Sequence, residues 1–265
     1  MSARGASDSS VLHLPMWDAS MSRAELSHLA ETMSKALVAA GANDQDVVAI
    51  AMTNSVDFVV SFLGVSWCRC VVLPLNPVNK EDEFYSFLED ADVKYLLLAE
   101  DGHVEAEKAA KRNGTKVIKV NVSLGKHFDF QLKCFLDGSE VTPDPNGALR
   151  SPKPTDKVLI LHTSGTTGKP KCVPHTHLSL CAALRNVNWT YDMCEEVSLQ
   201  VMPLFHPHGL TQGTCLWHQD GLMPTSHLFF LIQRCLVCNY STYGRFHSFR
   251  VYMYRPCLNA LSIAL

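Results

Sequence analysis

The sequence predicts an α/β protein with a parallel β-sheet that helices cover on both faces. Between residues 23 and 120, segments with helical spacing of apolar side chains alternate four times with short apolar segments typical of strands. The expected strands are almost continuously apolar, which is typical of strands buried on both faces. Because a crossover helix usually joins neighbouring parallel strands, this alternation favours a parallel sheet.

The first expected helix covers residues 23–40 and ends before Gly41. Turn or capping residues separate the later elements, such as Asn54 and Ser55 before the second helix and Asn113-Gly114 after the fourth. The predicted strands are residues 46–52, 71–77, 95–99 and 116–120, and the predicted helices between them are residues 56–66, 81–89 and 103–112.

Residues 123–154 have a weaker pattern, rich in proline and polar residues toward the end, and we expect a surface connector there. A buried strand should follow at residues 157–161. Further along, Thr176 should cap a helix that runs to about Trp189, and residues 197–204 should form another strand.

Composition indicates a globular protein of one large or two small domains. Of its 265 residues, 47% are hydrophobic and 18% are charged, and the net charge of −3 argues against nucleic acid as the main partner. The longest apolar window, residues 58–75, is interrupted by Gly64, Arg69 and Pro74, so we expect a helix and a strand there rather than a membrane span. Neither a secretory signal at the start nor a Ser-Lys-Leu signal at the end is found, so we expect a cytoplasmic protein.

Ten cysteines are many for such a chain, and without a secretory signal we expect thiols rather than disulfides. Cys68 and Cys70 lie in an apolar segment and should be buried. The spacing of Cys235 and Cys238 outlines half a zinc site, but a second pair is missing, so we attribute it to chance and predict no metal ligands from this pair.

A loop rich in hydroxyls and glycines follows the strand at residues 157–161. Its glycines let the backbone turn closely around a ligand, and its hydroxyls, amides and lysines favour a polyanion such as the phosphates of a nucleotide. The commonest phosphate loop does not fit, because Thr163 replaces its first glycine and Pro170 replaces its final Ser or Thr. The alternative is an ordinary surface loop with incidental lysines. The loop reads Thr163-Ser164-Gly165-Thr166-Thr167-Gly168-Lys169-Pro170-Lys171.

This loop closely resembles the signature of adenylate-forming enzymes, which include acyl-CoA synthetases, peptide-synthetase adenylation domains and luciferases. The resemblance implies part of the large N-terminal domain of that family. It also implies a reaction in which a carboxylic acid attacks ATP, bound with Mg2+, to give an acyl-adenylate that passes to CoA. By the same resemblance Lys171 is also catalytic and Thr167 is the residue nearest to Mg2+. The implied nucleotide-binding residues are Thr163, Ser164, Gly165, Thr166, Thr167, Gly168, Lys169 and Lys171.

A second segment, residues 202–210, resembles a family motif in which an aromatic-histidine pair follows a strand. The resemblance implies that His206 orients the acyl carboxylate and the adenylate, as a catalytic and substrate-binding residue, and that His208 lines the substrate pocket. The alternative is that both histidines are loop residues with backbone partners. A metal site is disfavoured, because no cysteine or carboxylate cluster accompanies them.

Three earlier segments, residues 46–50, 54–58 and 74–77, also fall where acyl-CoA synthetases have a strand, a helix and a turn. Among these enzymes the motifs look most like the oxalate–CoA ligase branch, followed by the 4-coumarate–CoA ligase-like branch, so the substrate should be a small or aromatic carboxylic acid. One departure is Cys172, where the family usually has glycine; its β-carbon should crowd the loop.

The resemblance covers about residues 24–213. We therefore expect a flexible N-terminus at residues 1–22, a partial AMP-binding domain at residues 23–210 and an irregular, poorly ordered tail at residues 211–265. The tail has one acidic residue, no lysine and four arginines, and we attribute it to alternative splicing, intron read-through or a frameshifted gene model.

Two hypotheses follow, because the family's later adenine and ribose motifs and its C-terminal lysine are missing. The chain is an acid–thiol ligase, incomplete as it stands, or a non-catalytic remnant that binds nucleotide weakly or associates with a full-length homologue. A P-loop kinase is disfavoured by the loop spacing.

Overall fold

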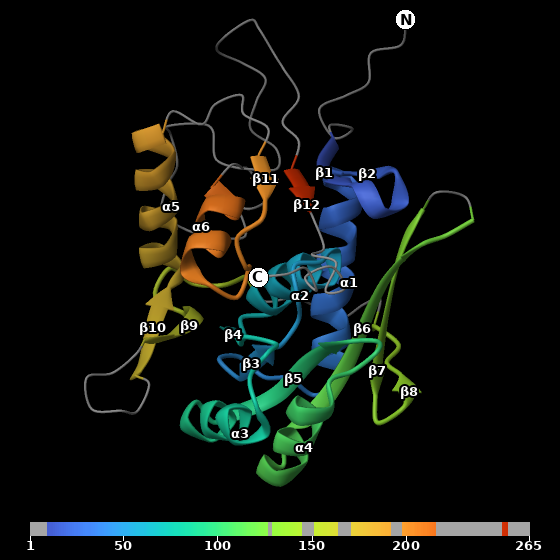
Figure 1. Ribbon diagram of the computed structural model, residues 1–265, viewed down its shortest axis with the longest axis vertical. Coiled ribbons are helices and arrows are strands. Elements are labelled where there is room, and N and C mark those ends of the chain that lie inside the picture. Colours follow the sequence, from blue (N-terminus) through green and yellow to red (C-terminus); the bar gives the residue numbers. More distant parts are fainter. Residues whose placement is uncertain are drawn as a thin grey trace, which may run out of the picture.

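The centre of the molecule is an eight-stranded sheet in the order β10-β9-β4-β3-β5-β6-β7-β8 (Figure 1). This computed structural model describes residues 10–126, 129–144, 151–163, 171–191, 198–215 and 251–253. The strands of this sheet are β3 (Val47–Ile50), β4 (Val71–Pro74), β5 (Val93–Ala99), β6 (Lys116–Leu124), β7 (Phe130–Leu136), β8 (Ser139–Glu140), β9 (Lys157–Thr163) and β10 (Lys171–Thr176). The helices are α1 (Arg23–Ala39), α2 (Val56–Trp67), α3 (Glu81–Asp90), α4 (Val104–Asn113), α5 (His177–Tyr191) and α6 (Pro207–Cys215).

The five inner strands, β9, β4, β3, β5 and β6, are parallel, as predicted. Both edges are antiparallel, because β10 turns back along β9 and β7 turns back along β6. The prediction of a connector over residues 123–154 was therefore wrong for residues 130–140, which form β7 and β8. Strand β7 alternates apolar and polar residues over residues 130–134, as an antiparallel strand with one solvated face should.

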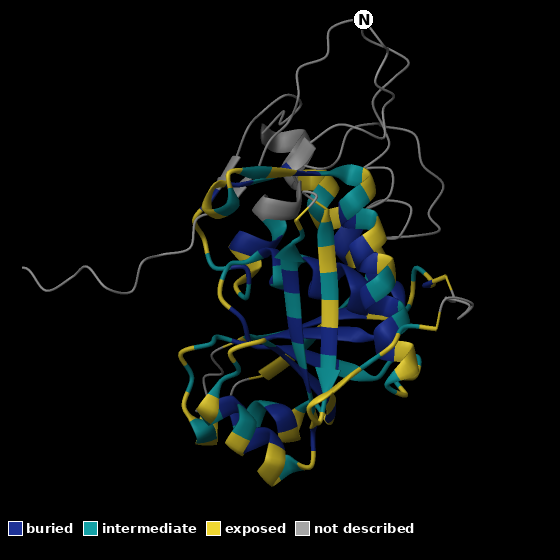
Figure 2. Cartoon of the chain, turned by 90° about the vertical axis from the view of Figure 1, so that its right-hand side faces the viewer, coloured by how far each residue is buried: buried dark blue, intermediate teal, exposed yellow. Residues whose placement is uncertain are grey.

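Two hydrophobic cores lie on opposite faces of the sheet. Successive residues of β5 divide between them, since Leu97 belongs to the core under α1 and α2 whereas Leu96 belongs to the core under α3 and α4. Figure 2 shows the buried residues along the inner strands and on the helix sides that face them. The prediction of a sheet covered on both faces is confirmed.

The expected helices all form, with boundaries that differ from the predictions by a few residues at most. Ser22 and Glu25 cap α1 reciprocally, and Ser55 caps α2 by accepting a hydrogen bond from Phe58 N at 3.2 Å. Thr176 caps α5 as predicted, because its hydroxyl accepts a hydrogen bond from Ser179 N at 3.2 Å.

A second, four-stranded sheet has the order β11-β12-β1-β2. Its strands are β1 (Ser10–Leu14), β2 (Ala19–Ser22), β11 (Ser198–Gln200) and β12 (Val251–Met253), with a short 3-10 helix, η2 (Pro15–Trp17), between the first two. The structure thus differs from the flexible N-terminus expected over residues 1–22, since from Ser10 onward strands form and bury Leu12, Leu14 and Met21. Strand β12 belongs to the expected tail, most of which lies outside the described residues.

Cys68 and Cys70 are buried thiols, as predicted. A hydrogen bond with Cys68, together with burial, raises the pKa of the Cys70 thiol. Cys235 and Cys238 lie outside the described residues. Within the described parts of the chain, no helix is both long and apolar enough to cross a membrane, and no group of three or more candidate metal ligands gathers.

Candidate functional site

The predicted phosphate loop joins the two strands of the β9–β10 hairpin. Thr163, at the end of β9, is the register partner of Lys171, at the start of β10. The two strands therefore bring one hydroxyl residue and one lysine to the base of the loop, on opposite sides. Residues 164–170 lie outside the described residues, so the predicted roles of Ser164, Gly165, Thr166, Thr167, Gly168 and Lys169 stay predictions.

The next pair along the hairpin is His162 and Cys172. The sulfur of Cys172 lies 3.1 Å from Nε2 of His162, and the His162 ring contacts Phe87 of α3 with 4.4 Å between ring centroids. Burial lowers the pKa of His162 and raises the pKa of the Cys172 thiol, so both groups are neutral at neutral pH. The β-carbon that was expected to crowd the loop belongs instead to a strand residue that pairs across the hairpin.

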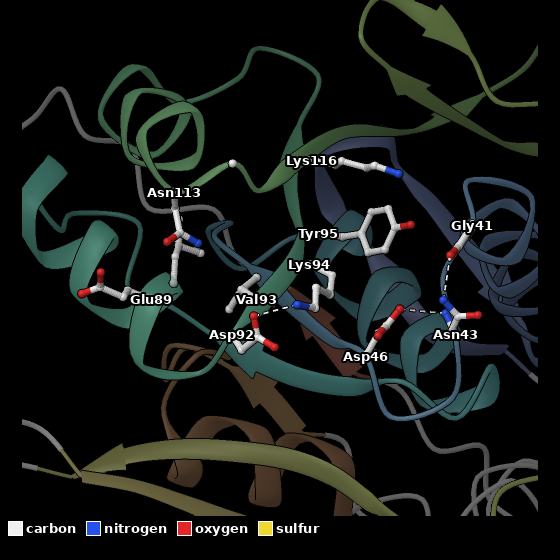
Figure 3. A pocket seen from close by; sticks show the side chains of 12 residues that line it. Gly41, Asn43, Asp46, Glu89, Asp92, Val93, Lys94, Tyr95, Asn113 and Lys116 are labelled. Carbon is white, nitrogen blue, oxygen red and sulfur yellow. Dashed lines mark hydrogen bonds and ion pairs between the residues drawn. The ribbon is translucent and has the colours of Figure 1, made fainter.

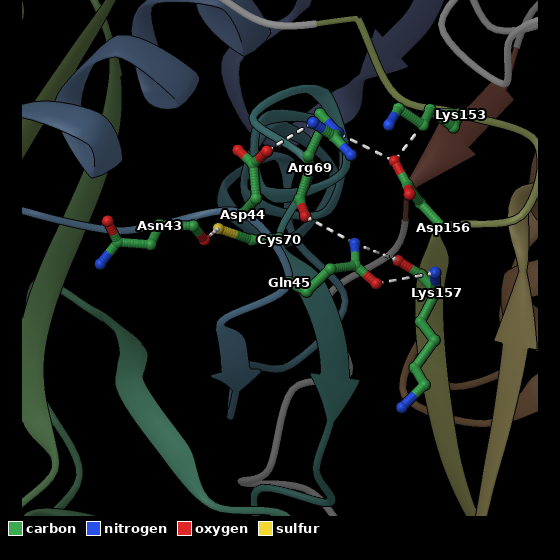
Figure 4. A network of polar contacts seen from close by, with 8 residues as sticks. All are labelled: Asn43, Asp44, Gln45, Arg69, Cys70, Lys153, Asp156 and Lys157. Carbon is green, nitrogen blue, oxygen red and sulfur yellow. Dashed lines mark hydrogen bonds and ion pairs between the residues drawn. The ribbon is translucent and has the colours of Figure 1, made fainter.

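A polar network fastens the other end of β9 to the sheet (Figure 4). Arg69 donates from Nε to Asp156 at 2.8 Å and also pairs with Asp44. The side chain of Gln45 accepts a hydrogen bond from Lys157 N at 3.0 Å and donates to Arg69 O at 2.9 Å. The start of β9 is thus tied to the loop before β3 and to the turn after α2, which fixes the strand that leads into the predicted phosphate loop.

His206 lies at the start of α6, where it has the position of an N-cap. Its Nδ1 accepts a hydrogen bond from His208 N at 3.2 Å, and its own backbone N donates to Pro203 O at 3.0 Å. Because Nδ1 is an acceptor, the neutral ring carries its proton on Nε2. Both histidines are exposed. His206 therefore has the backbone partner that the loop alternative expected and still presents an Nε2–H donor at the surface.

The hairpin and the histidine segment lie in the same part of the molecule. Helix α5 follows β10 directly and packs on α6, and Figure 1 shows these elements side by side. Among the described residues, no hydrogen bond joins Thr163 or Lys171 to His206 or His208. The structure thus pairs Thr163 with Lys171 and His206 with His208. Asn54, expected only as a turn residue, was missed: its side chain bonds to the backbone just before His206.

Two cavities lie at opposite ends of the inner strands. One, of about 510 Å³, is at the amino ends of β5 and β6 and mixes carboxylates with lysines, among them Asp92, Lys94 and Lys116 (Figure 3). The other, of about 280 Å³, lies at the carboxyl ends of β3, β5 and β6, beside Asn54 and Trp17. The predicted phosphate loop follows the carboxyl end of β9, and ligands of parallel sheets bind at carboxyl ends. The first cavity is therefore not part of this candidate site.

Comparison with known proteins agrees with this arrangement of elements. The family described as "AMP-binding enzyme" matches residues 2–223. An oxalate–CoA ligase of Arabidopsis thaliana is 36% identical over 195 residues, which cover 73% of this chain and 37% of that protein. A probable CoA ligase of Humulus lupulus is 33% identical over 205 residues, which cover 73% of this chain and 36% of that protein. The chain thus spans little more than a third of the length of these curated relatives.

Solved structures share the fold at lower identity. The apo structure of MatB from Rhodopseudomonas palustris has a TM-score of 0.67 at 20% identity, covering 95% of this chain and 43% of that chain. The o-succinylbenzoate CoA synthetase MenE from Bacillus subtilis, solved as a double mutant, has a TM-score of 0.66 at 19% identity, covering 94% of this chain and 42% of that chain.

Proposed function

Since this chain belongs to the AMP-binding enzyme family, we propose that it is an acid–thiol ligase that activates a carboxylic acid with ATP and transfers the acyl group to CoA. The observation that carries the proposal is the β9–β10 hairpin, which sets Thr163 opposite Lys171 at the two ends of the hydroxyl- and glycine-rich loop. A hydroxyl and an ammonium group at the base of such a loop suit a phosphate ligand.

The proposed residue roles are those that the resemblance to the family implies. Thr163 and Lys171 would hold phosphate oxygens of ATP together with Ser164, Gly165, Thr166, Thr167, Gly168 and Lys169, and Thr167 would lie nearest to Mg2+. His206 would donate from Nε2 to the acyl carboxylate, since its Nδ1 is occupied by His208 N. His208 would line the substrate pocket. Bound ATP with Mg2+ would supply the activated phosphate.

The relatives suggest which acids to test. Oxalate–CoA ligase, malonate–CoA ligase and 4-coumarate–CoA ligase are among the proteins with 28–36% identity to this chain. We therefore propose a short dicarboxylic acid or an aromatic acid as the substrate, and a cytoplasmic enzyme.

A second candidate function is a non-catalytic protein that binds nucleotide weakly or associates with a full-length homologue. The observation that favours it is that, among the described residues, no hydrogen bond joins Thr163 or Lys171 to His206.

Exchange of labelled pyrophosphate into ATP separates the two candidates. The purified chain is incubated with Mg-ATP and oxalate, malonate or 4-coumarate in turn. Exchange that depends on one of these acids supports the ligase, and its absence with all of them supports the second candidate.

The substitution Lys171→Ala tests whether the loop base carries the reaction. We expect it to lower the rate of exchange by about a hundredfold or more, because it removes a positive charge beside the phosphates on which negative charge develops in the transition state. Lys157→Ala is the matched control, since Lys157 lies at the opposite end of the same hairpin and its exposed side chain points away from the network. Equal losses in both variants would contradict a specific role for Lys171.

A further inference from the structure

The side chain of Asn54 joins two parts of the chain that are far apart in sequence. Asn54 lies between the carboxyl end of β3 and Ser55, which caps α2. Its backbone is fixed on both sides, because Met52 is buried and Ser55 is hydrogen-bonded to the first turn of α2. The backbone position from which the Asn54 side chain extends is therefore well defined.

The Asn54 carboxamide makes two hydrogen bonds to the backbone that precedes His206. Nδ2 donates to Met202 O at 2.9 Å, and Oδ1 accepts from Leu204 N at 2.8 Å. A carboxamide offers the same donor and acceptor as a peptide group, and two bonds that flank one residue in this way are the pattern of a parallel strand pair. Asn54 thus acts as a one-residue strand partner for Pro203.

Helix α6 closes the other side of the same backbone. A β-carbon at Gly209 would lie 2.2 Å from Pro203 O and 2.8 Å from Met202 O, so α6 lies directly against these peptide groups. Leu204 is buried next to them, with 4% of its surface exposed. The backbone of Met202 and Pro203 is therefore in contact with both Asn54 and the first turn of α6.

This backbone determines where the ring of His206 lies. His206 N donates to Pro203 O, which closes a turn over residues 203–206, and the ring then caps α6. We propose that Asn54 is a positioning residue that holds this turn and so sets the place of the His206 Nε2–H donor. The hydrogen bonds stand on the structure alone, whereas their effect on turnover rests on the proposed function.

Amide hydrogen exchange, followed by NMR on the 15N-labelled chain, tests the positioning without any substrate. Asn54→Ala should raise exchange at the amides of Leu204 and His206 about tenfold, because the first loses its acceptor and the turn loosens. The amide of Phe58 should keep its rate, which shows that the junction of β3 and α2 is intact. Unchanged rates at Leu204 and His206 would overturn the proposal.

The matched variant Asn54→Asp keeps the shape but removes the donor. When the introduced carboxyl group is ionised, its second oxygen faces Met202 O and repels it; when it is protonated, its hydroxyl can donate to that carbonyl. Protection of Leu204 and His206 should therefore recover as pH falls through the titration of this group. If the amides of Leu204 and His206 in Asn54→Asp are equally protected at every pH, the donor role of Asn54 is contradicted.

Pyrophosphate exchange then measures the consequence for the reaction. Asn54→Ala should raise KM for the acid and lower kcat, together by about tenfold or more, because the carboxylate partner is misplaced. The Kd for Mg-ATP should stay within about twofold, because the predicted phosphate loop belongs to the β9–β10 hairpin and not to the turn that Asn54 holds. The exposed neighbour Thr53 provides the control Thr53→Ala.

The two proposals fail in different ways. If the unmodified chain shows no exchange with any acid, the proposed function fails, and hydrogen exchange still decides the role of Asn54. If the unmodified chain is active and Asn54→Ala changes neither KM nor kcat, the positioning role is wrong while the ligase stands.

Discussion

Asp156 gathers three parts of the chain at the start of β9. Its carboxylate accepts hydrogen bonds from Arg69 Nε and Lys153 N, both at 2.8 Å, and its backbone carbonyl accepts one from His177 N at 3.0 Å. Burial raises the pKa of Asp156, but the hydrogen bonds and the charge of Arg69 outweigh burial and lower the pKa below its usual value of 3.8. One half-buried aspartate therefore links β9, α5 and the turn after α2.

The lowered pKa makes the stability of the protein depend on pH in a defined direction. A group whose pKa is lower in the folded state contributes stability above its unfolded pKa and loses it as pH falls through the folded pKa. At pH 7 we expect Asp156→Asn to lower the free energy of unfolding by about 1–3 kcal/mol. As pH falls below about 4 the difference should shrink progressively, because the carboxyl group of the unfolded chain binds a proton there, and that of the folded chain does so only as pH falls through its lowered pKa.

Urea denaturation at a series of pH values measures this difference. Asp92→Asn is the control, because the Asp92–Lys94 pair is exposed, and its loss should cost no more than about 0.5 kcal/mol. A difference for Asp156→Asn that does not change between pH 7 and pH 3 would show that the lost stability is not electrostatic.

At the scale of residues, the sequence indicated which kind of ligand a segment suits, but not which distant residues a side chain bonds to. The hydroxyls, glycines and lysines of the loop are recognisable because a phosphate ligand needs donors close together in the chain. The partners of Asn54 lie 148 and 150 residues away, and a lone asparagine before a helix cap reads as a turn residue. No local pattern indicates which distant backbone such a side chain will reach.

At the scale of elements, the inner parallel strands were predictable because they contain apolar runs and because a helix follows β3, β4 and β5. The antiparallel strands β7 and β10 were not predictable in the same way, because each faces solvent on one side and carries polar residues. In β7 the alternation of Phe130, Leu132 and Cys134 with polar residues was a usable signal of a strand with one solvated face. In β10, Pro174 and the polar residues around it conceal the strand, which pairing with β9 stabilises.

The contact between α1 and α2 depends on one glycine. A β-carbon at Gly64 would lie 2.5 Å from Cβ of Met33, and Gly64 O accepts a hydrogen bond from the Ser34 hydroxyl at 2.7 Å. Both Met33 and Ser34 are fully buried. The two helices therefore approach more closely than any residue with a side chain would allow.

Gly64→Ala should lower the free energy of unfolding by about 1–3 kcal/mol, because overpacking outweighs the better helix propensity of alanine. The reverse exchange on an exposed face, Ala39→Gly in α1, should cost no more than about 1 kcal/mol. Both values come from urea denaturation followed by circular dichroism. A Gly64→Ala protein that is as stable as the unmodified chain would show that α1 and α2 can move apart at no cost.

At the scale of the whole molecule, one sheet supports two cores, and the candidate site depends on both. The core under α1 and α2 includes Leu204 and Leu210, which flank His206, whereas Ile160 of β9 belongs to the core under α3 and α4. Strand β9 also contributes Val158 and Leu159 to the core under α1 and α2, so the strand that leads into the predicted phosphate loop is anchored in both cores. A fixed position of this loop relative to the histidine segment therefore requires that both cores form.

Neighbouring leucines of β5 test whether the two cores unfold as one unit. Leu96 and Leu97 are both fully buried and belong to different cores. Truncation of either to alanine should lower the free energy of unfolding by about 2–5 kcal/mol and should leave a single transition. Circular dichroism and intrinsic fluorescence should then give coincident urea curves for Leu96→Ala and for Leu97→Ala, because each core needs the strands that the other covers.

Lys94→Ala, on the same strand but exposed, should leave the free energy of unfolding within about 0.5 kcal/mol of that of the unmodified chain. If one leucine variant separates the two curves while the other does not, the cores fold independently, and the hairpin and His206 would then not be held in one fixed arrangement.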